Sequence, residues 1–429
     1  MDGHHRAAPD GRPVPDPRVA IETVFRLEYP RVVAVVARVV RDVGIAEELA
    51  QDALVAALEQ WPRDGVPDSP GAWLTAAARH RAVDLVRRRE NYARKLREMG
   101  RDQPTTTAPP EEPADADDID DDLLRLVFTA CHPVLSAEAR TALTLRLLGG
   151  LTTPEIARAF LVPEPTVAQR IVRAKKTLAT RNVAFEVPYG PDREARLGSV
   201  LDVIYLIFNE GYAATAGDDW LRPALCEDAL RLARQLAALM PNESEVHALA
   251  ALLEFQASRT PARTAADGTP VLLRDQDRRR WDRRLVARGI AALDRAGATA
   301  AAAPGPYALQ AAVAACHAHA PDYEDTDWAA IATLYGLLAA RAPSPVVELN
   351  RAVAVSMTEG PGPALEIVDG LTDEPSLRAY HLLPSVRGDL LLRLGRPAQA
   401  RAEFERAAGL TGNARERELL RARAADCGG

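Results

Sequence analysis

Hydrophobic positions recur at helical spacing along nearly the whole chain, and this pattern predicts an all-α fold. Between residues 18 and 100 it indicates three helices, of which the third runs from about Ala72 to Arg97. The apolar stripe of the first helix comprises Val32, Val35, Val36, Val39 and Val40, and that of the second comprises Ile45, Leu49, Ala53, Leu54 and Leu58. The segment 61–71, WPRDGVPDSPG, is predicted to be a loop that no helix crosses. Strand patterns are nearly absent.

Residues 151–178 have the pattern of a helix-turn-helix. A helix start signal at Thr152–Glu155 precedes a short helix, a break at Val162–Pro163 follows, and a second helix begins near Glu164. The expected buried positions are Ile156 and Phe160 on the first helix and Val167, Ile171, Ala174 and Leu178 on the second. The expected outward positions are Thr166, Gln169, Arg170, Arg173, Lys175 and Lys176. These residue types suit contacts with bases and phosphates, although a helical hairpin with a solvated basic face has the same pattern.

From Val200 onward the pattern is again helical, with more alanine and leucine. Near the end, small and large residues fall at the positions of a tetratricopeptide helix pair, namely Gly388, Leu391, Gly395, Ala400, Phe404 and Ala407. A weaker echo about 36 residues earlier comprises Ala352, Val355, Ala364, Val368 and Leu371. We expect the small residues to let the two helices approach closely while Phe404 fills the gap.

Composition limits the class of protein. The 429 residues suffice for two to four domains, and 47% hydrophobic with 26% charged residues is typical of a soluble globular protein. The net charge of −7, taken over the whole chain, argues against nucleic-acid binding, but the charges are not evenly distributed. Residues 79–101 are rich in arginine, whereas residues 102–122 contain acids and no lysine or arginine. Because charges more than about 10 Å apart are screened, the local basic segment decides what is bound.

Other features predict a cytoplasmic protein that is not an enzyme. We find no membrane span and no signal peptide, and the four cysteines are far apart. No catalytic motif, metal site or cofactor site is expected. Cys131 beside His132 fits a core thiol at a helix end, and His317 and His319 fall on different faces of a helix. The run RDQDRRRWDRR at 274–284 is expected to be a solvated or interdomain charge patch.

Taken together, these segments resemble the extracytoplasmic-function sigma factors of bacterial RNA polymerase. The resemblance rests on LEYPRVVAVVARVVRDVGIAEELAQDALVAALEQW, then GAWLTAAARHRAVDLVRRRE, then the helix-turn-helix. The tail with FNEGY at 208–212 and the repeats resembles the branch with a long C-terminal extension. The implied organisation is a disordered terminus (1–17), region 2 (18–100), an acidic flexible linker (101–121), region 4 (122–184) and a helical extension (185–429).

The resemblance implies that core RNA polymerase is a partner, contacted through its β′ clamp and its β flap. The helix with the A-E-x-x-x-Q-D pattern would dock on the clamp through Glu47, Glu48, Gln51 and Asp52. Acids and an amide on a solvent-facing helix suit a basic, polar partner surface. Taken without the resemblance, the same residues are an ordinary solvated helix face.

Promoter DNA is the second implied partner. In the family the 61–71 loop captures a base of the −10 element, and here it offers Asp64, Gly65, Asp68 and Ser69. Trp73 could stack on that base, but its helical spacing favours a core position. The next helix would bind and melt the strands through Arg79, Arg81, Arg87 and Arg88, with His80 where relatives carry Asn and Asp84 orienting a neighbouring arginine.

The −35 element would be read by the second helix of the helix-turn-helix. Candidate readers are Glu164, Thr166, Gln169, Arg170 and Arg173, with Lys175 and Lys176 placed for phosphates. The extension implies control of activity in cis, or through a regulatory protein or ligand. Two other classes stay open from residues alone: a stand-alone DNA-binding regulator with a sensing domain, and an enzyme housed in the C-terminal half.

Overall fold

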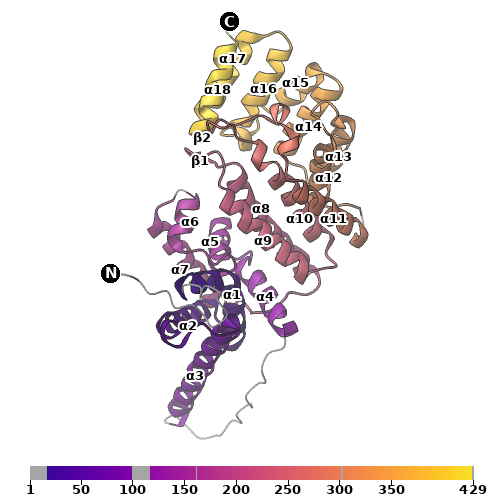
Figure 1. Cartoon of the computed structure of the whole chain (residues 1–429). Coiled ribbons are helices and arrows are strands. Elements are labelled where there is room, and N and C mark those ends of the chain that lie inside the picture. Colours follow the sequence, from indigo (N-terminus) through magenta and orange to yellow (C-terminus); the bar gives the residue numbers. More distant parts are fainter. Residues whose placement is uncertain (1–16, 99–115, 161, 301–302, 428–429) are drawn as a thin grey trace, which may run out of the picture. The chain divides into compact units, whose positions relative to one another are not determined.

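The computed structural model describes residues 17–98, 116–160, 162–300 and 303–427. The regular secondary structure of its described residues is almost all helical, which confirms the all-α prediction (Figure 1). The chain divides into two compact units, residues 1–203 and residues 204–429, and the boundary falls inside one helix. No helix among the described residues is both long and apolar enough to cross a membrane.

The first unit is built from α-helices. Their bounds are α1 (Pro17–Val40), α2 (Val43–Asp64), α3 (Pro70–Glu98), α4 (Ala116–Ala130), α5 (Ala137–Leu147), α6 (Thr153–Phe160), α7 (Glu164–Thr180) and the first half of α8 (Pro191–Tyr212). Helix α1 packs against α2, α3 and α4. Its residues Val32–Ala37 are all at most 2% exposed, so Val32, Val35 and Val36 of the predicted stripe lie in this core, whereas Val39 and Val40 are partly buried.

Helix α2 buries a different face from the one its leucines predict. The buried positions are Val43, Ala46, Glu47, Ala50, Ala53, Ala56, Ala57 and Trp61. Leu58 is 49% exposed, and Leu49 and Leu54 are only partly buried. The small alanines allow α1 and α2 to approach closely, and this packing outweighs the larger leucines. The expectation that Glu47 faces solvent is therefore wrong.

The loop after α2 is shorter than the sequence suggests. Helix α2 continues through Pro62 to Asp64, and α3 begins at Pro70, so only residues 65–69 lie between the two helices. Gly65 ends α2 with φ +87° and donates its amide hydrogen to the carbonyl of Trp61 at 3.0 Å. Its positive φ favours glycine at this position.

The acidic segment ends earlier than its composition indicates. Residues 101–115 of the expected linker, like residues 1–16 of the expected disordered terminus, lie outside the described residues, whereas α4 begins at Ala116. Asp122 is 0% exposed. Its carboxylate accepts a hydrogen bond from Arg125 at 2.6 Å and lies 3.2 Å from the Arg38 guanidinium of α1. The last acid of the acidic stretch 102–122 therefore joins two helices of the core.

The second unit is a longer series of helices. Its elements are the rest of α8, β1 (Ala216–Gly217), α9 (Pro223–Leu239), α10 (Ser244–Ser258), the 3-10 turns η1 (Thr260–Ala262), η2 (Leu273–Asp275) and η3 (Arg278–Arg280), α11 (Arg283–Thr299), α12 (Pro306–His319), α13 (Trp328–Arg341), α14 (Pro345–Thr358), α15 (Pro361–Asp369), η4 (Pro375–Leu377), α16 (Leu382–Arg393), α17 (Pro397–Leu410), β2 (Gly412–Asn413) and α18 (Ala414–Asp426). The two short strands pair in parallel. Asn413 reinforces this pairing, because its buried side chain donates to the carbonyls of Ala214 and Asp219 at 3.2 and 2.9 Å.

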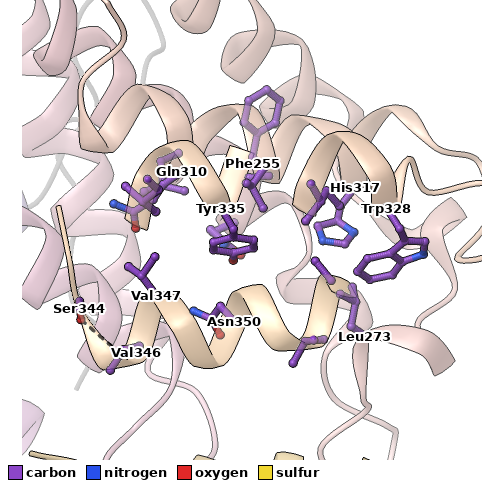
Figure 2. A pocket seen from close by; sticks show the side chains of 18 of the residues that line it. Phe255, Leu273, Gln310, His317, Trp328, Tyr335, Ser344, Val346, Val347 and Asn350 are labelled. Atoms are coloured by element: carbon purple, nitrogen blue, oxygen red, sulfur yellow. Dashed lines mark hydrogen bonds between the residues drawn. The ribbon is translucent and has the colours of Figure 1, made fainter. Parts of the chain in front are cut away.

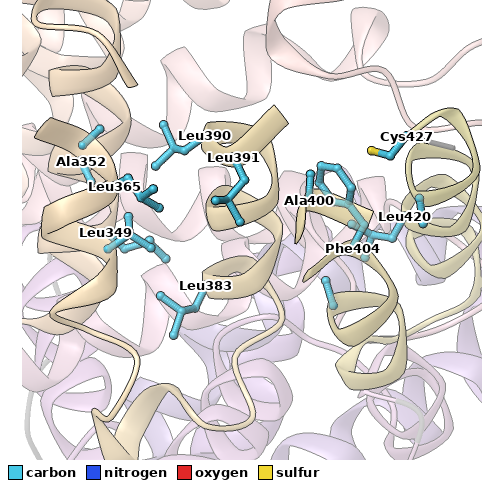
Figure 3. Close-up of a cluster of buried hydrophobic side chains, with 14 of the residues drawn as sticks. Leu349, Ala352, Leu365, Leu383, Leu390, Leu391, Ala400, Phe404, Leu420 and Cys427 are labelled. Carbon is cyan, nitrogen blue, oxygen red and sulfur yellow. The ribbon is translucent and has the colours of Figure 1, made fainter. Parts of the chain in front are cut away.

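The last helices have the packing that the repeat pattern predicts. Phe404 is 0% exposed and lies in a cluster with leucines of α16 and α18 (Figure 3). A methyl group on Gly388 would lie 2.8 Å from the Phe404 ring, so glycine is what allows α16 and α17 to approach this closely. The earlier echo occupies α14 and α15, where Ala352, Ala364 and Val368 are 0% exposed.

The arginine-rich run at 274–284 is only partly a solvated patch. Arg278 is 4% exposed and Trp281 is 3% exposed. The Arg278 guanidinium donates to the carbonyls of His317 and Ala320 and to the Thr326 hydroxyl at 2.8–3.0 Å. This arginine therefore fastens the turn η3 to the end of α12, a role that charge alone did not indicate.

Candidate functional site

Helices α6 and α7 form the predicted helix-turn-helix. Thr152 and Glu155 make a reciprocal cap at the start of α6, because the Thr152 amide donates to the Glu155 carboxylate at 2.7 Å and the Glu155 amide donates to the Thr152 hydroxyl at 3.4 Å. The break at Val162–Pro163 lies where it was predicted. All four expected core residues of α7 are at most 5% exposed, namely Val167, Ile171, Ala174 and Leu178.

The other face of α7 carries the predicted readers. Glu164, Gln169, Arg173 and Lys176 are exposed, and Thr166 and Arg170 are partly buried. Lys175 departs from the prediction, because its ammonium is ion-paired with Glu47 and its stem packs on Gly44. The face can therefore offer an acid, an amide and cations to a ligand, with one of its lysines engaged inside the protein.

Glu47 is the centre of a buried ionic cluster between α2, α5 and α7. Its side chain is 4% exposed and contacts the Arg146 guanidinium, whose Nε donates to Oε1 at 2.6 Å, and the Lys175 ammonium. Gln51 also donates to Oε1 at 2.9 Å. Burial and the Glu47 carboxylate raise the pKa of Tyr29. One acid with two cationic partners and an amide donor is a well-paired arrangement.

Two of the three remaining residues expected to dock on the clamp face outward. Glu48 and Asp52 are exposed, and Gln51 is partly buried. Further along the helix Val55 is 53% exposed and Leu58 is 49% exposed. Their spacing of three or four residues places Glu48, Asp52, Val55 and Leu58 on one side, called here the α2 outer face. It combines acids with apolar side chains.

The 65–69 loop and the residue before it present the expected polar groups. Asp64, Gly65, Asp68 and Ser69 are all exposed. Trp73 instead packs edge-on against the buried Trp61, with ring centroids 5.6 Å apart at 70°. This contact favours the core interpretation of Trp73 over a free stacking platform.

Helix α3 carries cations along its length. Arg87 and Arg88 are exposed, and Arg79 and Arg81 are partly buried. Asp84 does not orient an arginine as expected, because its carboxylate lies 3.5 Å from His80 Nδ1 on the next turn. That pair is exposed and contributes little to stability. The arginines of α3 have guanidinium groups that can bind phosphates.

Sequence reasoning missed Arg146. It lies within TALTLRLL at 141–148, where the other positions are buried or nearly so, and a single arginine in such a run is a signal that a buried acid is its partner. The Cys131 interpretation is confirmed: the thiol is 1% exposed, lies 3.3 Å from the Thr144 hydroxyl, and has its pKa raised by burial to about 11.

Comparison with known proteins supports the assignment of sigma regions 2 and 4 to this chain. The sigma-70 region 2 family matches residues 24–92 and the sigma-70 region 4 family matches residues 125–178. The extracytoplasmic-function sigma factor SigK of a Mycobacterium species is 34% identical over 156 residues, which is 35% of this chain and 77% of SigK. SigC of Mycobacterium tuberculosis is 32% identical over 140 residues, 32% of this chain and 70% of SigC. The chain belongs to the extracytoplasmic-function sigma factors.

The sigma factor extends well beyond the region it shares with SigK. An uncharacterized protein of Rhizobium meliloti is 43% identical over 406 residues, which cover 91% of this chain and 92% of that protein. Residues 196–297 match a family of unknown function, DUF6596. No solved structure matches the chain significantly. The two sigma regions imply core RNA polymerase and promoter DNA as partners, and they do not favour a stand-alone regulator. This is not an enzyme family.

Proposed function

We propose that this sigma factor joins core RNA polymerase through the α2 outer face and region 4, and recognises a promoter at two elements. The observation that carries the proposal is the pair of exposed surfaces on separate helices: acids with apolar side chains on α2, and polar with basic side chains on α7. Both surfaces fall within the matched sigma regions. A protein of this kind acts in the cytoplasm, where polymerase and promoters are.

The β′ clamp contact is assigned to Glu48 and Asp52, supported by Val55 and Leu58. Exposed aliphatic side chains give an interface its buried centre, and acids around them select a basic partner and speed association. Gln51 and Glu47 can join this contact only after the ionic cluster opens, because the cluster holds both side chains. The flap contact is assigned to region 4 as a whole.

The −10 contact is assigned to the loop around Gly65 and to α3. Extruding a base costs a few kcal/mol, and the exposed Asp64, Asp68 and Ser69 offer hydrogen bonds that offset part of this cost. Arg79, Arg87 and Arg88 hold the backbone, and His80 stands beside them. Trp73 supports the loop from beneath through Trp61 rather than stacking on the base.

The −35 contact is assigned to the exposed face of α7. Gln169 and Arg173 have the side chains that form paired hydrogen bonds with adenine and guanine edges. Glu164, Thr166 and Arg170 lie nearer the start of the helix, where they can meet bases or neighbouring phosphates. Lys176 is free to bind phosphate, and Lys175 becomes so when it leaves Glu47.

The Glu47 cluster supports a closed form of regions 2 and 4. It pairs Glu47, on the helix expected to dock on the clamp, with Lys175, on the helix expected to read the promoter. Polymerase therefore competes with an internal partner. We further propose that the C-terminal extension modulates activity in cis, through a bound regulatory protein or ligand.

The test is transcription in vitro with reconstituted holoenzyme, with start sites mapped across the genome of the source organism. We expect starts at a shared pair of sequence elements with the spacing of −35 and −10 boxes. Starts that are no more frequent than with core enzyme alone would refute the promoter-specificity role. Deleting residues 204–429 tests the extension, and unchanged core binding and promoter activity would exclude its role in control.

A further inference from the structure

The second unit contains a cavity of about 470 Å³ that the sigma-factor role does not use. It lies among α10, α12, α13 and α14, and its residues come from segments spread between 205 and 354. Cavities that bind small molecules typically measure about 300–1,000 Å³. Figure 2 shows Tyr335 in the middle of this cavity, His317 and Trp328 together on one side, and Gln310 and Val347 on the other.

The cavity wall is mixed, with tightly packed apolar side chains beside polar ones. Phe255 and Ile331 are each 1% exposed, and Leu252 is 3% exposed. Phe255 is held from behind by α11, because a methyl group on Gly289 would lie 2.8 Å from its ring. A wall of this kind exists before any ligand arrives, so binding an apolar body there costs little reorganisation.

One side of the cavity carries polar atoms without partners. His317 and Trp328 contact edge to face at 5.2 Å. The Nδ1 of His317 and the Nε1 of Trp328 are buried and have no hydrogen-bond partner among the described residues. Burial and the charges of Arg259 and Arg278 lower the pKa of His317 to about 3, so its ring is neutral at physiological pH. A buried donor without an acceptor is a costly arrangement unless something binds it.

Arg259 is the charged residue of the cavity wall. Its guanidinium donates to the side-chain oxygens of Gln256 at 3.0 Å and Gln276 at 3.4 Å, and it lies 5.5 Å from the Trp281 ring centroid. These partners are all uncharged, and no carboxylate of the described residues lies within ion-pairing distance of it. The cavity therefore combines apolar walls with an uncompensated positive charge and an indole donor, and it has no acidic residue in its wall.

We propose that this cavity binds a small apolar monocarboxylate, with its ring or alkyl body among Phe255, Ile331, Tyr335 and Val347 and its carboxylate directed to Arg259. The charge of the ligand matches the one charged residue of the wall, and its oxygens are acceptors for the donors on that side. The promoter and polymerase contacts assigned above all lie in the first unit, so ligand binding can succeed or fail independently of them.

The experiment is isothermal titration calorimetry of the full chain with phenylacetate, 3-phenylpropionate, indole-3-acetate and octanoate, each against its primary amide. We expect at least one acid to bind one site per chain with a Kd below about 1 mM. Its amide should bind at least about tenfold more weakly, because a charge-assisted hydrogen bond is lost.

Three variants locate the site. Val347→Trp fills the cavity and should abolish binding. Arg259→Gln should remove the preference for acid over amide while leaving binding of the apolar body. Leu337→Trp is the matched control, because Leu337 is on α13, 54% exposed and not part of the cavity wall, so its binding should be unchanged. Circular dichroism of each variant verifies folding.

Several outcomes would overturn the proposal. These are the absence of binding for all four acids to the wild-type chain, equal affinity for acid and amide in the wild-type chain, and binding that persists in a folded Val347→Trp variant. The first two need no variant, so the proposal stays testable even if a substitution prevents folding.

Discussion

Glu47 of α2 accepts a hydrogen bond from Arg146 of α5 at 2.6 Å, across 99 residues of sequence. Lys175 of α7 pairs with the same carboxylate. A residue expected to face polymerase is therefore enclosed by two cations of region 4. The two ends of the contact lie in regions 2 and 4, each of which is proposed to bind polymerase and promoter DNA, so the pair would link binding by the two regions.

Arg146→Gln should weaken this closed form. Removing one charged partner of a buried carboxylate costs about 2 kcal/mol, which Lys175 limits by remaining in place. We expect a lower free energy of unfolding for the first unit together with up to about tenfold tighter binding to core polymerase. Denaturant unfolding measures the free energy of unfolding, and biolayer interferometry measures the affinity for core polymerase. Arg181→Gln, an exposed arginine after α7, is the control. Unchanged affinity in Arg146→Gln would refute competition by the cluster.

Arg173→Ala should reduce transcription much more than it reduces polymerase binding. Arg173 is exposed on α7, and loss of one good base contact weakens discrimination by about 1–3 kcal/mol. We expect promoter-dependent transcription to fall by about tenfold or more, with the largest loss at one base pair of the −35 element. A panel of single-base promoter variants identifies that pair. Equal losses at every promoter variant would show that Arg173 contacts only the backbone.

Gly388→Ala should destabilise the second unit by about 1–3 kcal/mol, because the added methyl meets the Phe404 ring at 2.8 Å in a filled core. Gly409→Ala is the matched control, since that glycine also lies in this helix pair and nothing is within 4 Å of its would-be methyl. Chemical denaturation measures both. Combining Gly388→Ala with Phe404→Leu should recover part of the loss, and no recovery would contradict the contact as its cause.

The stability of the second unit should fall between pH 7 and pH 5 because of His317. The folded-state pKa of about 3 lies below the unfolded value near 6.5, so the unfolded chain takes up a proton that the folded chain does not. The stabilising difference is complete above the unfolded pKa and decreases as pH falls through it. The loss is about 2 kcal/mol at pH 5.

The measurement for His317 is denaturant unfolding at both pH values for the wild type, His317→Gln and His319→Gln. His319 is the control, because it lies two residues away on the same helix and is exposed. His317→Gln should lose about 2 kcal/mol less than the wild type between the two pH values. A His317→Gln variant with the full wild-type dependence would contradict the assignment.

The sequence predicts well those features that depend on local periodicity. The four core residues of α7 and the Gly388–Phe404 pair follow from spacings of three or four residues, and a helix of given phase must bury them together. The family resemblance rests instead on the particular residues of these segments and on their order along the chain. Exposed positions such as Gln169 and Arg173 follow from the same phase.

Features that depend on distant partners were not predictable. Glu47 is buried because the alanines of α2 pack closely on α1 and because two cations far along the chain meet it, and neither fact is visible in the local pattern. Arg278 and Trp281 lie in a run that looks solvated, yet the end of α12 covers them. The cavity is likewise formed by side chains from α8, α10, α12, α13 and α14 and from the turn η2, so no single segment indicates it.

Regions 2 and 4 of this chain are proposed to bind core RNA polymerase. The Kd for purified core enzyme tests this most directly, measured by biolayer interferometry on the full chain and on the chain ending at Val203, the last residue of the first unit. We predict a one-to-one complex, weakened by at least about tenfold in Leu58→Glu, which places a charge on the α2 outer face. Absence of binding by both chains would contradict the account.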